Sequence, residues 1–426
     1  MAIDPEKFLN ELFGVAVEAV SADRCLASYL PSPPKGKTLV IGAGKAAASM
    51  AKAVEENWHG PLSGLVITRY GHGLALDDIE LVEAGHPVPD EAGAAAADDI
   101  ISRLAGLSED DLVLCLISGG GSSLLAKPAS GISLNDKKQI NKALLRSGAT
   151  ISEMNTVRKK LSAVKGGRLA IAAYPAKVVT LLISDVPGDD PSVIASGPTI
   201  ADHSTLDDAR KILAKYTISL PAAVDHLFQN GDTDTPDPEH PVFKNSVIDI
   251  IAKPQDALQA AANFAREQGI EPMILGDSIE GEAKDVALVH AGIARQVLLH
   301  NEPIKAPCVI LSGGETTVTV SNDLKNPGRG GRNAEFLLAF AKAMEGEPRV
   351  HAFAADTDGI DGTEDNAGAL CGPTTLKRAR AQSLDPSDYL QRHDAYSFFD
   401  ALGDLVKTGP TRTNVNDFRA ILILPE

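Results

Sequence analysis

The chain has 426 residues, enough for two or three domains of ordinary size. Its formal net charge of −17 argues against a nucleic-acid partner, because an acidic surface repels phosphate backbones. No stretch reaches about 18 uninterrupted apolar residues, so we expect no transmembrane helix and no membrane partner. The first ten residues lack the apolar run of a signal peptide, and the four cysteines lie far apart. We therefore expect a cytoplasmic enzyme with reduced thiols.

Apolar runs of strand length alternate with helical patterns along the chain. In chain order we predict helix 5–20, strand 38–41, helix 45–56, strand 64–68, helix 91–105, strands 111–117, 178–184 and 246–251, helix 254–268, strands 271–276 and 308–312, helix 334–344, and strands 350–354 and 420–424. This alternation predicts an α/β fold with largely parallel sheets covered by helices. The segment 229–241 is rich in Pro, Asp and Gly, and predicts a boundary between domains 1–240 and 241–426.

The first predicted strand runs into Gly42, Ala43, Gly44 and Lys45. This turn is neither a complete dinucleotide fingerprint, because position 47 is Ala, nor a Walker A loop. A lysine at a helix start opposes the helix dipole, so the fold gains nothing from it. We interpret Lys45 as an anion-binding residue; the alternative is a tolerated surface lysine.

A second glycine-rich turn follows the buried strand 111–117. Consecutive glycines let the backbone wrap a ligand, although a flexible turn with serine caps is the alternative. Downstream, basic residues crowd the stretch 155–168 of this acidic chain, where a solvated basic face is the alternative. From these segments we predict that phosphate or substrate binds to Ser118, Gly119, Gly120, Gly121, Ser122, Ser123, Asn155, Arg158 and Lys165.

Carboxylates follow two further strands. Asp185 and Asp189 come after strand 178–184, and Asp356 and Asp358 after strand 350–354. Carboxylates at strand ends can hold Mg²⁺ or accept a hydroxyl proton, although Asp also forms turns and caps helices. We predict Asp189 as a catalytic residue and Asp185, Asp356 and Asp358 as metal ligands.

In the second half of the chain, glycine loops also carry polar and charged residues. Arginine held by glycines at a helix start suits bidentate contact with phosphate or carboxylate; a plain hairpin or cap is the alternative. His86 also lies beside Gly and Pro, and either binds an anionic substrate or bonds within its turn. In these loops we predict Arg332 as a catalytic residue and Gly330, Gly331 and Asn333 as further phosphate-binding residues. We predict that the nucleotide binds to Gly313, Gly314, Glu315 and Thr316, and also to Gly42 and Gly44 of the first turn.

Taken in order, VIGAGKAA, LISGGGSSLL, MNTVRKKLSAVKGGRLA, LISDVPGD, IASGPT, LSGGETTV, GRGGRNAEF, DTDGIDG and TNVNDF resemble the class II glycerate kinases, also called the MOFRL-domain family. The resemblance implies a Rossmann-like first domain, a second α/β domain of MOFRL type and an active site in the cleft between them. It implies transfer of the γ-phosphoryl group of ATP to the 2-hydroxyl of D-glycerate, with Mg²⁺. The key lysine of the family matches Lys45 and its key arginine matches Arg332.

Two other functions remain open at this point. Some members of the family carry the name hydroxypyruvate reductase, and a nicotinamide-dependent reductase would need the dinucleotide fingerprint that position 47 leaves incomplete. A non-catalytic sugar-phosphate-binding protein could use the same glycine and basic loops, but it would have no use for the acids after the strands. The sequence leaves a homo-oligomer open.

Overall fold

The structure is a computed structural model that describes residues 3–230, 233–321 and 327–426. It contains two compact units. The N-terminal unit is Ala22–Ala252, and the C-terminal unit is Lys253–Glu426 together with the segment that ends at Ser21. We predicted the division between 240 and 241, whereas the two units divide after Ala252, because β6 (Val247–Ala252) pairs with β5 (Lys177–Ile183) in the first sheet. The helix Pro5–Ala19 also belongs to the C-terminal unit. Residues 231 and 232 of the predicted boundary segment lie outside the described residues.

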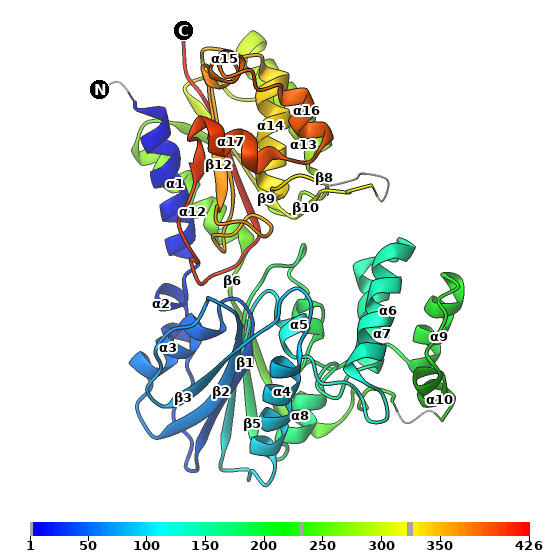
Figure 1. Cartoon of the computed structure of the whole chain (residues 1–426). Helices are drawn as coiled ribbons and strands as arrows, with labels where there is room; N and C mark the ends of the chain where they lie inside the picture. The colour runs from blue at the N-terminus through cyan, green and yellow to red at the C-terminus, as the bar shows by residue number, and fades with distance from the viewer. Residues whose placement is uncertain (1–2, 231–232, 322–326) are drawn as a thin grey trace. The chain divides into compact units, whose positions relative to one another are not determined.

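The described part of the N-terminal unit holds a six-stranded parallel sheet (Figure 1). Its order is β3-β2-β1-β4-β5-β6, which is typical of doubly wound nucleotide-binding folds and confirms the α/β prediction. The strands are β1 (Thr38–Ala43), β2 (Leu62–Arg69), β3 (Ile79–Ala84), β4 (Leu112–Ile117), β5 (Lys177–Ile183) and β6 (Val247–Ala252).

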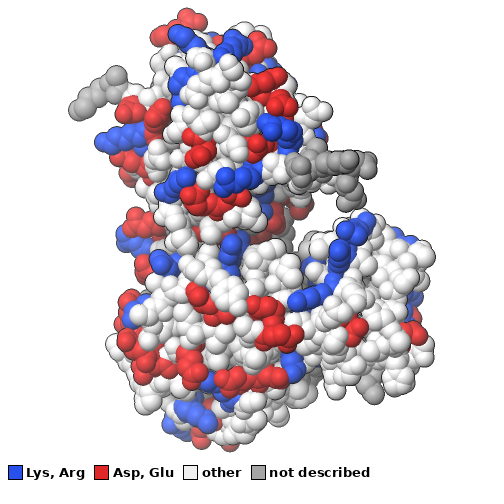
Figure 2. All heavy atoms as spheres, viewed as in Figure 1, with Lys and Arg blue, Asp and Glu red and all other residues white. Residues whose placement is uncertain are grey.

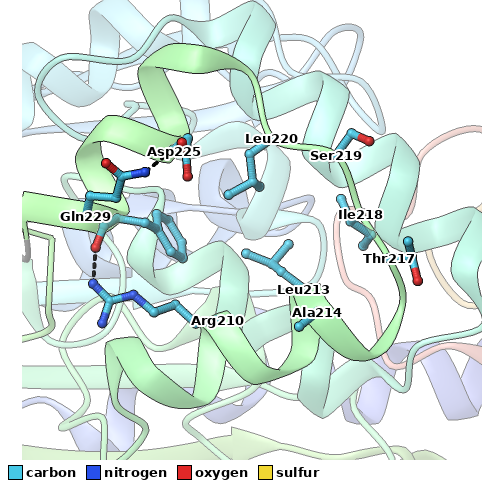
Figure 3. Close-up of a pocket in the computed structure, with 10 residues that line it drawn as sticks. Arg210, Leu213, Ala214, Thr217, Ile218, Ser219, Leu220, Asp225 and Gln229 are labelled. Atoms are coloured by element: carbon cyan, nitrogen blue, oxygen red, sulfur yellow. Dashed lines mark hydrogen bonds between the residues drawn. The ribbon is translucent and has the colours of Figure 1, made fainter.

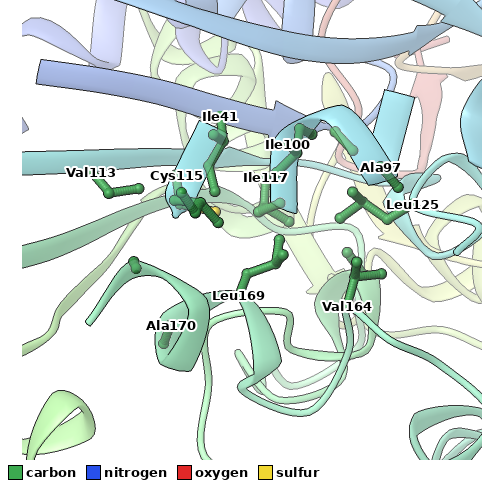
Figure 4. Close-up of a cluster of buried hydrophobic side chains, with 14 of the residues drawn as sticks. Ile41, Ala97, Ile100, Val113, Cys115, Ile117, Leu125, Val164, Leu169 and Ala170 are labelled. Atoms are coloured by element: carbon green, nitrogen blue, oxygen red, sulfur yellow. The ribbon is translucent and has the colours of Figure 1, made fainter. Parts of the chain in front are cut away.

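Helices cover both faces of this sheet. Helix α3 (Ala47–Asn57) lies on one face, and α4 (Glu91–Leu104) and α8 (Arg168–Ala173) lie on the other (Figure 1). Figure 4 shows the core that forms on the second face, where Cys115 and Ile117 of the sheet meet Ile100 and Leu169. Every residue of β4 is buried, which explains why this strand is apolar throughout rather than alternating.

A lobe of helices projects from the N-terminal unit and has its own apolar core. Three of its helices begin at capping boxes, in which a Ser or Thr and an acidic residue three positions later bond each other's backbone. These boxes are Ser133 with Asp136, Thr150 with Glu153, and Thr205 with Asp208. The lobe consists of α6 (Leu134–Ser147), α7 (Ile151–Lys160), α9 (Leu206–Lys215) and α10 (Ala222–Asn230).

The described part of the C-terminal unit contains a mixed sheet of order β13-β12-β11-β14-β9-β7. Only β7 and β9 pair in parallel, because β14 runs antiparallel to both of its neighbours and β12 returns beside β11. The prediction of parallel strands therefore holds for the first sheet and for one pair of the second. The strands are β7 (Glu271–Gly276), β9 (Cys308–Gly314), β11 (Val350–Asp356), β12 (Gly368–Cys371), β13 (Leu405–Val406) and β14 (Asp417–Ile423).

Helices pack on both faces of the second sheet. Helix α1 packs on α12 although they are far apart in sequence, and α13 packs on α14 (Figure 1). The short strands β8 (Gly281–Glu282) and β10 (Thr316–Thr317) pair in parallel. The helices are α1 (Pro5–Ala19), α12 (Pro254–Glu267), α13 (Ala283–His300), α14 (Arg332–Met344), α15 (Thr375–Ala381), α16 (Pro386–Gln391) and α17 (Ala395–Leu402).

Two further observations bear on the class of protein. In the structure none of the four cysteines, all of which lie in the described ranges, forms a disulfide, and Cys115, Cys308 and Cys371 are buried. Among the described residues, no helix combines the length and the apolarity that crossing a bilayer requires.

Candidate active site

The candidate site lies where the strand order of the first sheet reverses, between β1 and β4. Ligands of doubly wound sheets bind beyond the carboxyl ends of the strands at such a point. Here the turns after the two strands are bonded to each other. The backbone N–H of Lys45 donates to the Gly119 carbonyl at 2.8 Å, and that of Ala46 donates to Ser118 Oγ at 3.0 Å. The structure thus brings together two segments that we predicted to bind anions.

Glycine is required at two positions of these turns. Gly44 has a φ of +148°, and a Cβ there would lie 2.0 Å from Ser118 Oγ. Gly120 has a φ of +82°, and its Cβ would lie 3.0 Å from the His86 ring and 3.3 Å from Lys45 Cγ. The side chains of His86 and Lys45 therefore flank Gly120. Gly42, by contrast, lies within β1 against the Leu116 carbonyl, so its lack of a side chain serves strand packing.

A cavity of about 260 Å³ opens beside this turn. It lies between the ends of β3 and β4 and the lobe helices α6 and α7. Six residues that we predicted or considered from the sequence line it: His86, Gly120, Ser122, Ser123, Arg158 and Lys165. The rest of the lining is Pro87, Pro89, Lys137, Lys138, Ile140, Asn141, Leu144, Leu145 and Leu161.

A chain of polar contacts fixes the cavity wall. Ser122 Oγ lies 2.9 Å from Ser196 Oγ, which donates to Asn155 Oδ1 at 3.3 Å. The Arg158 guanidinium donates to the same Asn155 oxygen at 3.4 Å and to Asn141 Oδ1 at 2.7 Å. Ser196 has a φ of +63°, a conformation that costs a non-glycine residue energy and persists where surrounding contacts enforce it. Asn155 thus orients Arg158 rather than lining the cavity itself.

Three cations of this wall have no carboxylate partner among the described residues. Lys137 Nζ donates to the Ala126 carbonyl at 3.1 Å, and Lys165 Nζ donates to the Ser122 carbonyl at 2.8 Å. Burial, with repulsion from Arg158, lowers the pKa of Lys137 to about 7. Burial also lowers the pKa of Lys165 well below its ordinary value, and Lys137 and Arg158 add to that effect. An anion in the cavity would relieve this cost.

Two neighbouring lysines have the opposite arrangement. Lys159 and Lys160 lie 3.2 and 3.1 Å from the carboxylate of Asp202, and Lys160 lies 2.8 Å from Asp234. Burial alone would raise the pKa of Asp202, but these two lysines hold it at about 2. Lys159 and Lys160 thus form buried ion pairs and have a structural role. Of the three consecutive basic residues 158–160, only Arg158 lines the cavity.

The sequence interpretation missed Lys137. The signal was present, because Lys137 occupies the apolar stripe of α6 between Leu134 and Ile140, three residues from each. All three side chains are buried, together with Leu144. A lysine in the buried stripe of an amphipathic helix points to an enclosed charged group.

A larger cavity, of about 450 Å³, lies between α9 and α10 (Figure 3). Its walls are largely apolar, from Leu213, Ile218 and Leu220. The charged groups at its rim are engaged, since Arg210 donates to the Phe228 carbonyl and Asp225 accepts from Gln229 at 2.8 Å. This cavity lacks the clustered cations of the first one.

The loop after β5 holds the predicted catalytic carboxylate. Asp189 has a φ of +55°, and its Oδ1 is buried with no hydrogen-bond partner among the described residues. A strained residue with an unsatisfied buried oxygen is typical of a functional position. Asp190 instead accepts the Ser192 N–H at 2.8 Å, as a turn former does. Neither Asp185 nor Asp189 is among the residues that line the 260 Å³ cavity.

In the C-terminal unit, Arg332 is surrounded by acids. Its Nε donates to Asp417 at 2.6 Å, its Nη2 to Asp356 at 2.9 Å and its Nη1 to Glu315 at 3.1 Å. Burial opposes the charge, but the three carboxylates raise the pKa of Arg332 well above its ordinary value. Arg332 is therefore neutralised in this structure, unlike the cations of the cavity, and a bound phosphate would have to displace or join these acids.

The free backbone N–H groups at the N-terminus of α14 are also occupied, by the side chain of Asp361. Asp361 accepts the N–H groups of Asn333 and Ala334 at 3.0 and 2.8 Å, and a Cβ on Gly331 would lie 2.2 Å from its Oδ1. Burial raises the pKa of Asp361 to about 6, although the two backbone bonds act against it. Gly331, which we predicted to bind phosphate with Gly330, thus makes room for Asp361. The Asn333 amide donates to Asp417 at 2.8 Å.

The remaining predicted residues of this unit surround Asp417. Thr316 donates to its Oδ2 from the backbone at 3.1 Å, and Gly314, with a φ of +119°, packs tightly against Ile279. Gly313 accepts from the guanidinium of Arg419 at 3.3 Å. The end of β9 therefore helps to hold Asp417, one of the acids around Arg332. The nucleotide contacts that we predicted for these residues stay a prediction.

The predicted metal ligands are divided between the units, with Asp185 in the N-terminal unit and Asp356 and Asp358 in the C-terminal unit. Asp356 accepts the Asp358 N–H with one oxygen and Arg332 with the other. In the described ranges no group of three or more His, Cys, Asp or Glu side chains is placed to hold a metal ion. A Mg²⁺ held mainly by nucleotide phosphates needs only one or two carboxylates, so the predicted residues fit an ion of that kind.

Comparison with known proteins places these units in a family. Residues 8–229 match a domain of unknown function, DUF4147, and residues 308–417 match the MOFRL family. A protein of Agrobacterium vitis with the provisional name hydroxypyruvate reductase is 52% identical, covering 99% of this chain and 95% of its own.

Two further comparisons name a kinase. A D-glycerate 2-kinase of Thermotoga maritima is 41% identical, covering 99% of this chain and 100% of its own. The crystal structure of a glycerate kinase from Thermotoga maritima superposes with a TM-score of 0.86 at 40% identity, covering 98% of this chain and 99% of the other. The chain therefore belongs to the family of class II glycerate kinases that carry the MOFRL domain.

Proposed function

We propose that this chain is an ATP-dependent kinase that phosphorylates the 2-hydroxyl of D-glycerate, giving 2-phosphoglycerate and ADP. The observation that carries the proposal is the group of uncompensated cations beside the β1–β4 switch point of a doubly wound sheet. Phosphoryl transfer depends mainly on positioning and on neutralising charge, which such a site supplies. The relatives named D-glycerate 2-kinase and glycerate kinase support the same substrate.

The proposed roles follow from the local chemistry. Lys45, beside Gly120, stabilises the phosphoryl group during transfer, because its stem passes that turn. Asp189 accepts the proton of the attacking hydroxyl, since a buried carboxylate oxygen without a hydrogen bond is a competent base. Arg332 contributes charge from the C-terminal unit. Mg²⁺, when bound with ATP, would neutralise phosphate oxygens, and Asp185, Asp356 and Asp358 are the residues proposed to hold it.

The reductase alternative is weaker on structural grounds. In dinucleotide-binding folds the third glycine of the fingerprint permits close packing of helix and strand. This chain has Ala47 at that position, and its side chain is fully buried at the start of α3. The first relative bears the reductase name, so the two activities need a direct comparison.

One pair of assays separates the two functions. The purified protein is incubated with D-glycerate, ATP and Mg²⁺ while ADP is followed by a coupled reaction, and separately with hydroxypyruvate and NADH or NADPH while absorbance at the nicotinamide band is followed. The proposal expects ADP that depends on glycerate and no nicotinamide oxidation. Nicotinamide oxidation without ADP would establish the reductase, and binding without either reaction would establish a sensor. We also expect a cytoplasmic enzyme with small-molecule partners.

A further inference from the structure

We propose that the 260 Å³ cavity binds the carboxylate of the acceptor acid, and that Lys137 is a substrate-binding residue there together with Lys165 and Arg158. This inference rests on the proposed kinase function and deepens it, because it assigns the acceptor to one cavity. Nothing in the sequence motifs singled out Lys137.

The arrangement of the three cations is the first argument. They come from separate segments: Lys137 from α6, Arg158 from α7, and Lys165 from the turn before α8. Lys137 is 8% exposed and Lys165 is 1% exposed, and no described carboxylate pairs with them. Burying like charges without counter-ions costs stability, and such a cost is retained where a ligand supplies the missing charge.

The hydrogen bonds show how the ammonium groups are held. Lys137 Nζ donates to the Ala126 carbonyl and lies 3.5 Å from that of Lys127. Lys165 Nζ donates to the Ser122 carbonyl and lies 3.5 Å from that of Ala195. An ammonium group has three donors, so each lysine keeps a proton for an acceptor in the cavity. The carbonyl bonds fix the two groups before any ligand arrives.

The size and lining of the cavity favour a small hydroxy acid over a nucleotide. Pockets that enclose drug-sized ligands have volumes of roughly 300–1,000 Å³, and this cavity is smaller. Ser122 and Ser123 line it together with the cations. The Ser123 hydroxyl donates to the Gly120 carbonyl, so its oxygen can accept a hydrogen bond from an alcohol group of the acid. Ile140, Leu144 and Leu161 form an apolar wall that excludes water from one side. A carboxylate with adjacent hydroxyls matches this combination of groups.

The lobe also offers an approach for anions. Figure 2 shows Lys and Arg side chains gathered along the lobe that α6 and α7 form. The basic residues of α6 are Lys137, Lys138, Lys142 and Arg146, of which the last two are exposed. A local positive surface on a chain with a net charge of −17 attracts acidic ligands to the cavity.

The test uses Lys137→Met, which keeps the length of the apolar stem but removes the charge. The control is Lys142→Met, on the same helix but exposed and outside the cavity lining. Thermal unfolding and calorimetry are measured with D-glycerate and, in separate titrations, with a non-hydrolysable ATP analogue and Mg²⁺. Kinase assays give KM for each substrate.

We expect Lys137→Met to unfold at the same or a higher temperature than the natural protein without ligand, because a buried charge has been removed. Its affinity for D-glycerate should fall at least about tenfold and its KM for glycerate rise accordingly, by the magnitude of one charge-assisted hydrogen bond. Affinity for the ATP analogue should change less than about twofold. Lys142→Met removes one exposed, solvent-screened charge, so it should keep the natural unfolding temperature and change the affinity for glycerate less than about twofold.

Three results would overturn the inference while leaving the kinase intact. The first is an affinity of Lys137→Met for glycerate that equals that of the natural protein. The second is a loss of affinity for the ATP analogue alone, which would show that the cavity binds phosphate. The third is a lower unfolding temperature of Lys137→Met while glycerate still raises that temperature as much as in the natural protein, which would show that Lys137 has a structural role. If Lys137→Met fails to fold, Lys165→Met is put through the same titrations with the same criteria. If the natural protein turns over no glycerate, the proposed function fails instead.

Discussion

Arg158 and Lys159 are adjacent on α7 but have opposite charge partners. Lys159 Nζ lies 3.2 Å from Asp202. The guanidinium of Arg158 instead donates to the side chains of Asn141, Asn155 and Met154, and it has no carboxylate partner within the described residues. The helix therefore directs one cation to a structural ion pair and its neighbour to the cavity. Function and stability should separate cleanly between these two positions.

Substitution of each residue by Met tests this separation. Lys159→Met leaves Asp202 with fewer partners, so we expect the free energy of unfolding to fall by about 1–3 kcal/mol with little change in KM. Arg158→Met should retain stability and raise KM for glycerate. Urea denaturation and steady-state kinetics measure both. A Lys159→Met protein of natural stability and impaired KM would contradict the assignment.

Lys45 is expected to act on the transferring phosphoryl group. Lys45→Met should lower kcat by at least about 10³-fold, by analogy with removing a group that clamps the phosphoryl in other kinases. The control is Lys52→Met on α3, the helix that follows the turn of Lys45; Lys52 forms a partly exposed ion pair with Asp77 at 3.2 Å, and the variant should keep natural turnover. Circular dichroism verifies folding. Turnover in Lys45→Met within tenfold of the natural protein would remove Lys45 from the mechanism.

Asp189 is expected to accept the proton of the acceptor hydroxyl. Asn tolerates the left-handed backbone of this position, so Asp189→Asn should keep its stability. Its kcat should fall about 10²–10⁴-fold, the usual contribution of a general base. Asp190→Asn removes the neighbouring acid that accepts the Ser192 N–H and serves as the control. Equal kinetics in the two variants would show that Asp189 is only a turn residue.

Because the pKa of Lys137 is lowered, we expect the affinity for glycerate to depend on pH. Its pKa is about 7 without ligand, and a bound carboxylate should raise that pKa, so binding above pH 7 takes up a proton and weakens as pH rises. Arg158, Lys165, Lys138 and His86 also line the cavity, and none of these groups supplies a negative charge. Calorimetry in buffers of different ionisation enthalpy measures the uptake.

The same lysine determines a trend in stability without ligand. Because its pKa in the folded protein is below that of the unfolded chain, the contribution of Lys137 to the free energy of unfolding increases as pH rises above about 7. Lys137→Met should lack both this increase and the proton uptake. Identical uptake in the variant and the natural protein would assign the proton to another group.

Each predicted strand and helix is present in the structure, with ends shifted by at most a few residues. Buried parallel strands are apolar throughout, and this pattern is visible in a single sequence. Five strands were missed for physical reasons, and three of them, β8, β10 and β13, have only two residues each. The strand β3 contains two glutamates, and β12 has only four residues, so neither forms a clear apolar run.

The site was predictable only in part. Glycine turns after strands located Lys45 and the turn around Gly120, because a parallel sheet brings strand ends together. Sequence could not reveal that Arg332 meets Asp417, a residue 85 positions away, since β14 returns antiparallel into the sheet. It likewise could not show that Asp361 fills the start of α14. Such pairings depend on tertiary structure, whereas the position of Lys137 in an apolar stripe was open to detection.

The regiochemistry of the product tests the central claim most directly. Phosphorus NMR of the reaction of ATP and D-glycerate distinguishes the two phosphate esters, because phosphorus on the C2 oxygen couples to one proton and phosphorus on the C3 oxygen couples to two. We predict a doublet, from 2-phosphoglycerate, that grows with ADP. A triplet, or no new phosphate ester while glycerate and ATP persist, would contradict the account.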